Sequence, residues 1–408
     1  MNARTNAGGK SGNTKAKDRA GAKVAGAAGA PVRFERNAGT INAALKKAPK
    51  VSVAEVLALK SGETVLIITN PEKDVQLISK ALYDAALEAG GKPTLVFQPA
   101  KSQLDFTEDA VISALRSEPD VVLSVSHLQL GKDLAAMKKP YRKGKGKTAV
   151  RYDHVFKYLL GAKKSRSFWS PWVTLGTFNR AVPIDYEKMR KECAALKRIL
   201  DRADSLRISA PGGTDLLIGL RGRKGRSGDG DFTTRGSGGN LPCGEAYVSP
   251  ELGASDGVIA FDGSMAVHDG VVVTEEPIMC TVKGGFSTRI TGGPEAKVLR
   301  NTIRRAKAST RRMLKNGLIT KALADQYMKN ATNLGELGIG TNPRARIVGN
   351  MLEDEKVLGT CHIAIGANYD EDAKALIHLD GLVKKPSMTA IFAKGKQTQF
   401  IKNGKLVF

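Results

Sequence analysis

The 408-residue sequence lacks any apolar stretch close to the roughly 20 residues that a membrane-spanning helix needs. Its longest apolar runs, at residues 64–68 and 270–274, have the length of single β-strands. Gly, Ala, Lys and Asn dominate the N-terminus, where a secretory signal would have an apolar core. We therefore expect a soluble, cytoplasmic protein with no membrane partner.

Cysteine and histidine are also scarce. The four cysteines lie far apart and form no CxxC pair, which favours reduced thiols in a cytoplasm. No GxGxxG follows the first predicted strand, so a dinucleotide site is not supported. Aromatic RNP, zinc-finger and helix-turn-helix patterns are missing too, which disfavours nucleic-acid binding as the main function despite the basic composition.

The net charge of +24 is concentrated in three segments. Residues 1–36 carry eight basic and two acidic side chains, residues 138–166 carry eleven and one, and residues 301–315 carry six and none. The first segment is rich in Gly, Ala and Lys, so we expect a disordered basic tail that at most binds polyanions weakly. The stretch at 138–147 is predicted as an exposed loop, and the third as the solvated face of a helix.

The pattern of apolar residues divides the chain near residue 185. Between residues 52 and 126, strands alternate with amphipathic helices, which is typical of parallel βαβ units. The sequence after residue 185 is rich in Gly and short strands, with helices at 185–201 and 294–315. We predict an α/β N-terminal domain at 37–185 with parallel βαβ units, and an α+β metal-binding domain at 186–408.

His378 and Asp380 form a possible pair of metal ligands. They lie in KALIHLDGLV, which is predicted to be a strand, and residues two apart share one face of a strand. A histidine and a carboxylate directed to one point are suitable ligands for zinc, cobalt or manganese. The alternative is a pair that hydrogen-bonds for stability alone.

Three further residues have unusual surroundings. His362 begins a short strand in which the small residues Ala364 and Gly366 share its face and leave room for an ion or a substrate. Glu336 lies in the apolar, Gly-rich NLGELGIGT, and Glu245 lies in NLPCGEAYVSP. A carboxylate in such a setting is costly to bury unless it meets a cation.

The segments NLPCGEAYVSP, NLGELGIGTNP, GTCHIAIGANY and IHLD together resemble the thermophilic metallo-aminopeptidase family of the aminopeptidase T and S type. The upstream APGGTDLLIGLRGR is similar to that family's GTD segment, and the resemblance covers roughly residues 185–408. It implies a peptide-hydrolysing enzyme, commonly a homodimer, with two divalent metal ions (Zn, Co, Mn or Mg). The implied metal ligands are Glu245, Glu336, His362, His378 and Asp380, with Tyr369 as the site tyrosine.

The resemblance also implies a glutamate shortly before the first histidine as general base. Glu355 and Glu353 precede His362 by seven and nine residues, and both are candidates for this base. Two cations can share a water, lower its pKa and polarise a carbonyl, after which such a base accepts the proton. Arg221 and Arg223 either bind a substrate carboxylate or lie in an exposed loop.

A second hypothesis is a ring-opening dioxygenase of the dihydroxypyridine type, a relative of the aminopeptidase family that uses one iron. His362, His378 and Asp380 would supply the two histidines and one carboxylate that iron needs. The presence of both Glu245 and Glu336 favours two metals, and metal content distinguishes the two activities.

Overall fold

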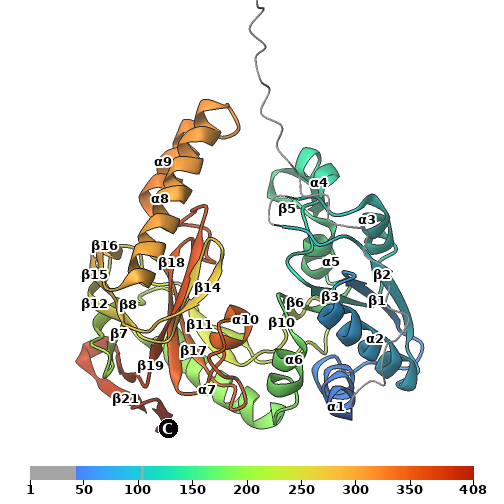
Figure 1. Cartoon of the computed structure of the whole chain (residues 1–408), viewed down its shortest axis with the longest axis horizontal. Coiled ribbons are helices and arrows are strands. Elements are labelled where there is room, and N and C mark those ends of the chain that lie inside the picture. The colour runs from blue at the N-terminus through green and yellow to red at the C-terminus, as the bar shows by residue number, and fades with distance from the viewer. Residues whose placement is uncertain (1–42, 103–104) are drawn as a thin grey trace, which may run out of the picture. The chain divides into compact units, whose positions relative to one another are not determined.

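The computed structural model describes residues 43–102 and 105–408. The predicted basic tail at 1–36 lies outside the described residues. Within these two ranges, no helix combines the length and apolar character needed to cross a membrane. The fold is mixed α/β, with one parallel sheet and two large antiparallel sheets (Figure 1).

The first sheet confirms the predicted parallel βαβ units. Strand β1 pairs in parallel with β2 on one side and β3 on the other, and helices α2 and α3 make the connections. Helix α2 buries Val75, Ile78 and Leu82, and Gly90 at φ +80° follows its end. The sheet has the order β10-β6-β3-β1-β2. These elements are β1 (Thr64–Thr69), α2 (Lys73–Glu88), β2 (Lys92–Phe97), α3 (Asp109–Arg116), β3 (Val121–Ser126), β6 (Arg166–Pro171) and β10 (Gly238–Asn240).

Strand β10 reaches this sheet from beyond the predicted domain boundary. Gly238 and Asn240 lie opposite Ser167 and Trp169 of β6, in a parallel pair. A segment about fifty residues past position 185 therefore completes the sheet of the N-terminal part. The division into domains at 37–185 and 186–408 stays a prediction.

The basic stretch at 138–147 differs from the predicted loop. Strands β4 (Tyr141–Lys143) and β5 (Val150–Tyr152) form a hairpin there. The tyrosines explain the ordered structure, because the Tyr141 ring stacks on Tyr158 at 5.3 Å and the Tyr141 hydroxyl accepts a 2.9 Å hydrogen bond from Arg116 Nε. Arg142, Lys143 and Lys145 still lie exposed, as the sequence predicts.

The remainder forms two antiparallel sheets whose facing sides share one core. One has seven strands in the order β14-β13-β19-β18-β17-β11-β9, and the other has eight in the order β16-β15-β12-β8-β7-β20-β21-β22. The first comprises β9 (Arg226–Gly228), β11 (Glu245–Val248), β13 (Ser264–Val267), β14 (Gly270–Val273), β17 (Leu334–Gly340), β18 (Thr360–Gly366) and β19 (His378–Lys384). The second comprises β7 (Ser205–Ser209), β8 (Asp215–Gly219), β12 (Ser255–Phe261), β15 (Ile278–Lys283), β16 (Phe286–Thr291), β20 (Ser387–Ile391), β21 (Gln397–Lys402) and β22 (Lys405–Leu406).

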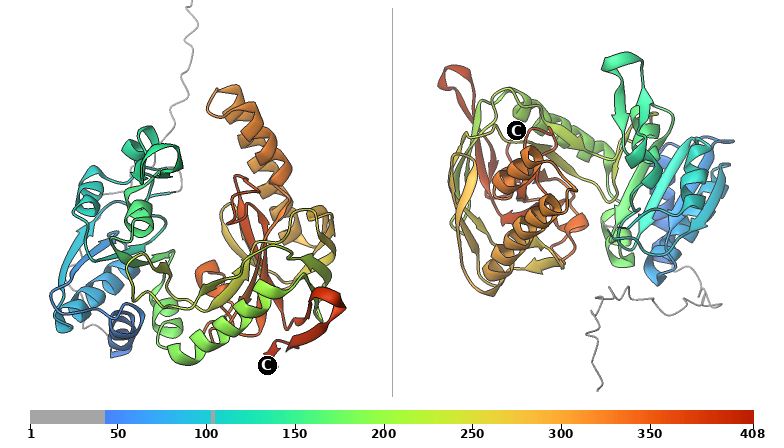
Figure 2. Two further views of the ribbon diagram at one scale, coloured as in Figure 1. Left: turned by 180° about the vertical axis from the view of Figure 1, so that it is seen from behind. Right: turned by 90° about the horizontal axis from the view of Figure 1, so that it is seen from above.

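Two long helices match the sequence prediction closely. Helix α7 (Tyr186–Arg202) buries Met189, Cys193 and Leu196 and packs against β9 and β11. Helix α8 (Pro294–Lys315) buries Leu299 and Ile303 and lies beside α9 (Lys321–Asn330), as Figure 2 shows. The predicted basic face of α8 is exposed, so its charges are solvated.

Candidate metal centre

Four neighbouring strands of the seven-stranded sheet bring the predicted ligands together. Glu245 begins β11, Glu336 lies in β17, His362 lies in β18, and β19 carries His378 and Asp380. Asp380 and Glu336 are both partnered with Ala364 of β18, which stands between them. Partnered residues share a face of a sheet, so the antiparallel register collects these side chains on one face.

Successive side chains of a strand point to opposite faces of the sheet, so the site and the core lie on opposite faces. Leu337, Ile339, Ile363 and Ile365 enter the core between the two large sheets, whereas the residues between them face the site. The site face is lined by small residues, and a β-carbon at Gly338 would lie only 1.9 Å from Nε2 of His362. The Gly-rich sequence of β17 therefore provides the space that the imidazole occupies.

Glu336 lies between the two histidines. Its Oε1 is 3.4 Å from Nε2 of His362, and its Oε2 is 3.1 Å from Nε2 of His378. Glu245 Oε2 approaches His362 Nε2 at 3.5 Å, and Asp380 Oδ1 approaches His378 Nε2 at 3.3 Å. The Glu336 carboxylate thus faces two pairs of potential ligands: Glu245 with His362, and His378 with Asp380.

Three groups of side chains have ligand atoms within 4.8 Å of one another. Across residues 43–102 and 105–408, no such group contains both histidines. Glu336 is shared by two of the groups, and His362 and Asp380 also meet Glu355 in the third. The groups are Glu245–Glu336–His362, Glu336–His378–Asp380 and Glu355–His362–Asp380.

Two buried polar atoms of the site suit a cation. Nε2 of His378 and Oδ1 of Asp380 have no hydrogen-bond partner among the described residues, although they lie 3.3 Å apart. The other ring nitrogen of His378, Nδ1, lies 2.8 Å from the Ala367 carbonyl oxygen, which can only accept a proton. Nδ1 is therefore the donor, and in the neutral ring the lone pair of Nε2 faces Glu336 and Asp380, as in histidines that bind metals.

When no cation is bound, protons on the two histidines neutralise part of the negative charge of the carboxylates. Burial lowers the pKa of His362, but the hydrogen bond and charge of Glu336 outweigh burial and raise it from 6.5 to about 9. For His378, the charge of Asp380 overcomes burial in the same way and raises the pKa well above 6.5. Burial raises the pKa of Asp380, yet the charge of His378 lowers it to about 2. Metal binding must therefore displace protons from the histidines.

The short helix α10 (Met351–Asp354) distinguishes Glu353 from Glu355. Glu353 is fully buried and accepts hydrogen bonds from Thr177 and from Arg180 at 2.6–2.8 Å, so it anchors the turn away from the ligands. Glu355 instead reaches His362 and Asp380, and burial raises its pKa from 4.5 to about 7. The structure therefore brings Glu355, and not Glu353, to the site.

Lys356 is a functional candidate that the sequence did not reveal. Its side chain is 1% exposed, and Nζ donates at 2.6 Å to Oε1 of Glu245 and also to Oε1 of Glu355. In the sequence it follows a run of charges that is typical of a surface turn, so nothing marks it as buried.

Tyr369 lies at the edge of the site. Its ring centroid is 5.1 Å from that of His378 and 5.5 Å from that of Tyr247, and its side chain stays half exposed. Arg223 and Arg226 both pair with Asp370, and Arg226 donates to the Tyr369 carbonyl. Arg223 thus holds the Tyr369 turn and is neither a free substrate ligand nor part of an exposed loop, whereas Arg221 is largely exposed.

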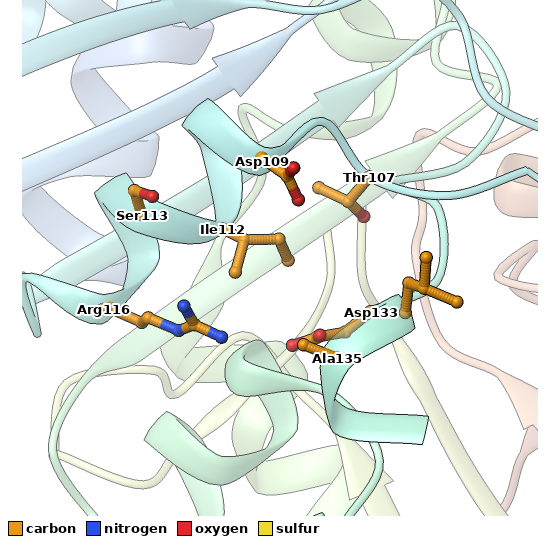
Figure 3. Close-up of a pocket in the computed structure, with 8 residues that line it drawn as sticks. Thr107, Asp109, Ile112, Ser113, Arg116, Asp133 and Ala135 are labelled. Carbon is orange, nitrogen blue, oxygen red and sulfur yellow. The ribbon is translucent and has the colours of Figure 1, made fainter. Parts of the chain in front are cut away.

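A separate pocket of about 300 Å³ lies in the N-terminal part and contains none of the predicted site residues (Figure 3). Asp109, Ile112 and Arg116 of α3 line one side, and Asp133 lies opposite. Arg116 is already bonded to Tyr141, and Asp133 caps the backbone of Ala136. These contacts give the polar groups structural roles, so we place the functional site at the sheet face instead.

Comparisons with known proteins support an enzyme but name two different activities. The family model NicX, 2,5-dihydroxypyridine 5,6-dioxygenase, matches residues 176–362, a little under half of the chain. No curated protein matches. The family match includes the segments with Glu245, Glu336 and His362, but it ends before His378 and Asp380.

Two solved structures share the fold. The 2,5-dihydroxypyridine dioxygenase from Pseudomonas putida KT2440 has a TM-score of 0.63 and 16% identity, covering 89% of this chain and 96% of its own. Wild-type AmpT (aminopeptidase T) from Thermus thermophilus has a TM-score of 0.60 and 18% identity, covering 90% and 99%. At these identities the two likenesses show a shared fold. The family model, by its name, favours the dioxygenase over the peptidase activity.

Proposed function

We propose that this chain is a metallo-aminopeptidase whose site holds two divalent cations, such as Zn, Co or Mn. The observation that carries the proposal is the position of Glu336, whose two oxygens face different histidines in different ligand groups. A carboxylate that faces two ligand sets is suited to bridge two ions. The unpartnered atoms of His378 and Asp380 support the same interpretation.

The site residues divide into ligands and a base. Glu245 and His362 would hold one ion, His378 and Asp380 the other, and Glu336 both. When bound, two such ions lower the pKa of a shared water and polarise a carbonyl. Glu355, whose pKa burial raises to about 7 when no cation is bound, would accept a proton from the attacking water and return it to the leaving amine.

The open edge of the site is suited to the N-terminus of a peptide. His378 is 23% exposed and Tyr369 is half exposed, whereas His362 is 1% exposed, so substrate would approach over Tyr369. A free amino terminus would bind one of the ions through its nitrogen lone pair, whereas the lone pair of an acetylated nitrogen is delocalised into the amide and is a poor ligand. The homodimer implied by the resemblance and the cytoplasmic location predicted from the cysteines and the N-terminal composition remain proposals.

A second candidate is a ring-cleaving dioxygenase with one iron, favoured by the NicX match and by the first of the two solved structures. His362, His378 and Asp380 would be its ligands. We place it second because the two histidines fall into different groups within the described residues, while Glu336 belongs to both groups.

Metal content and two substrates distinguish the candidates. We expect protein purified without a metal-affinity tag to contain about two Zn, Co or Mn per chain. It should release N-terminal residues from short unblocked peptides, stop with a chelator, and leave N-acetylated peptides intact. One iron per chain and oxygen uptake with 2,5-dihydroxypyridine would overturn the proposal in favour of the dioxygenase. Equal cleavage of blocked peptides would exclude an aminopeptidase.

A further inference from the structure

The buried ammonium of Lys356 connects two carboxylates that have different places in the site. Its Nζ binds Oε1 of Glu245, which leaves Oε2 of Glu245 facing His362 at 3.5 Å. It also binds Oε1 of Glu355. The opposing charges overcome the effect of burial and raise the pKa of Lys356, so the ammonium stays charged. Lys356 is thus a fixed cation that no chelator removes.

Glu355 is close enough to be a metal ligand. Its carboxylate forms a group within 4.8 Å with His362 and Asp380, each of which also belongs to one of the two groups that share Glu336. A glutamate at that distance could bind an ion held by His362 and so be lost as a base. The residue that restrains it is Lys356.

Building on the proposed two-metal site, we propose that Lys356 is a positioning residue that keeps Glu355 out of the metal coordination shell and available as the base. Three donors on the ammonium allow it to hold Glu245 and Glu355 at once. The neighbouring turn is fixed independently, because Asp354 accepts hydrogen bonds from Ser264 and from the backbone of Val348 and Gly349. Removing the lysine charge therefore frees the Glu355 side chain more than its backbone.

The test is Co²⁺ titration of metal-free Lys356→Met, Glu355→Gln and the double variant, followed by visible absorption. Co²⁺ absorbs less strongly as its coordination number rises. We expect Lys356→Met to show weaker absorption and at least about tenfold tighter binding, because a nearby positive charge is lost and a carboxylate ligand is gained. Glu355→Gln and the double variant should keep the wild-type spectrum, because glutamine is a poor ligand.

Several outcomes separate this inference from the proposed function. An unchanged Lys356→Met spectrum, or a change that persists in the double variant, would overturn the role of Lys356 while leaving two metals in place. A wild-type protein that binds fewer than two Co²⁺ would overturn the proposed function itself. Lys356→Gln, which loses the charge but keeps a polar head, is measured in parallel in case the methionine variant does not fold. Lys384→Met, at the exposed end of β19, is the control and should bind as wild type.

Discussion

Gly338 lies directly opposite His362 on the adjacent strand, and a β-carbon at position 338 would stand 1.9 Å from the imidazole Nε2. The backbone of β17 and the ring of His362 therefore occupy adjoining space that no side chain can share. Residues 337–339 pair with β18 without a register shift, so glycine is required at position 338 because of the His362 ring and not because of a turn.

We expect Gly338→Ala to displace His362 and to lose at least one metal per chain, because no shift of a flexible side-chain end relieves an overlap with a ring held in a sheet. Metal content by mass spectrometry checks this. Gly176→Ala is the matched control, since its β-carbon meets nothing closer than 3.8 Å and α6 (Leu175–Ala181) tolerates alanine. Full metal retention in Gly338→Ala would show that His362 is not a ligand.

Replacing Glu336 should remove more metal than replacing Asp380. Glu336→Gln removes the carboxylate charge that faces both His362 and His378, so we expect loss of both metals together with activity. Asp380→Ala leaves the group of Glu245, Glu336 and His362 intact, so we expect it to lose first the ion that His378 would hold, while the fold persists. Calorimetric titration of each variant with Zn²⁺ gives the stoichiometry. If Glu336→Gln still binds two ions, the bridging role is wrong.

The sequence predicts which side chains share a strand face better than it predicts which strands pair. A period of two along β19 was enough to expect His378 and Asp380 on one face, because strand geometry is local. Strand order and register depend on contacts between distant segments, so the pairing of Glu336 and Asp380 with Ala364 could not be read from the chain. Lys356 was not predicted for the same reason, because a lysine is buried only where the fold brings carboxylate partners to it.

Without metal, stability should fall as the pH rises through the pKa of His362. The folded protein raises this pKa from 6.5 to about 9, so it binds the proton more tightly than the unfolded chain does. The stabilisation is complete below pH 6.5 and is lost as the pH rises to about 9. Urea unfolding of chelator-treated protein should show this decline, and His362→Asn should flatten it. Metal-loaded protein should show the opposite trend in metal affinity, because protons compete with the ions.

Glu353 and Glu355 are two residues apart, yet neutralising them should affect turnover differently. Glu353 binds Arg180 and Thr177 in the interior, so Glu353→Gln leaves the guanidinium without its counter-charge. We expect a loss of about 2–3 kcal/mol in the free energy of unfolding, near the low end for a buried pair because Arg180 is 27% exposed. The folded fraction should keep both metals and its turnover. Glu355→Gln leaves the buried Lys356 ammonium paired with Glu245 alone and should also lower the free energy of unfolding, but its folded fraction should keep both metals and lose turnover by roughly 10²–10⁴-fold, as expected of a general base. Urea unfolding and peptide turnover, measured on both variants, check the pair. If Glu355→Gln kept full turnover while the folded Glu353→Gln lost it, the structural assignment of the two glutamates would be reversed.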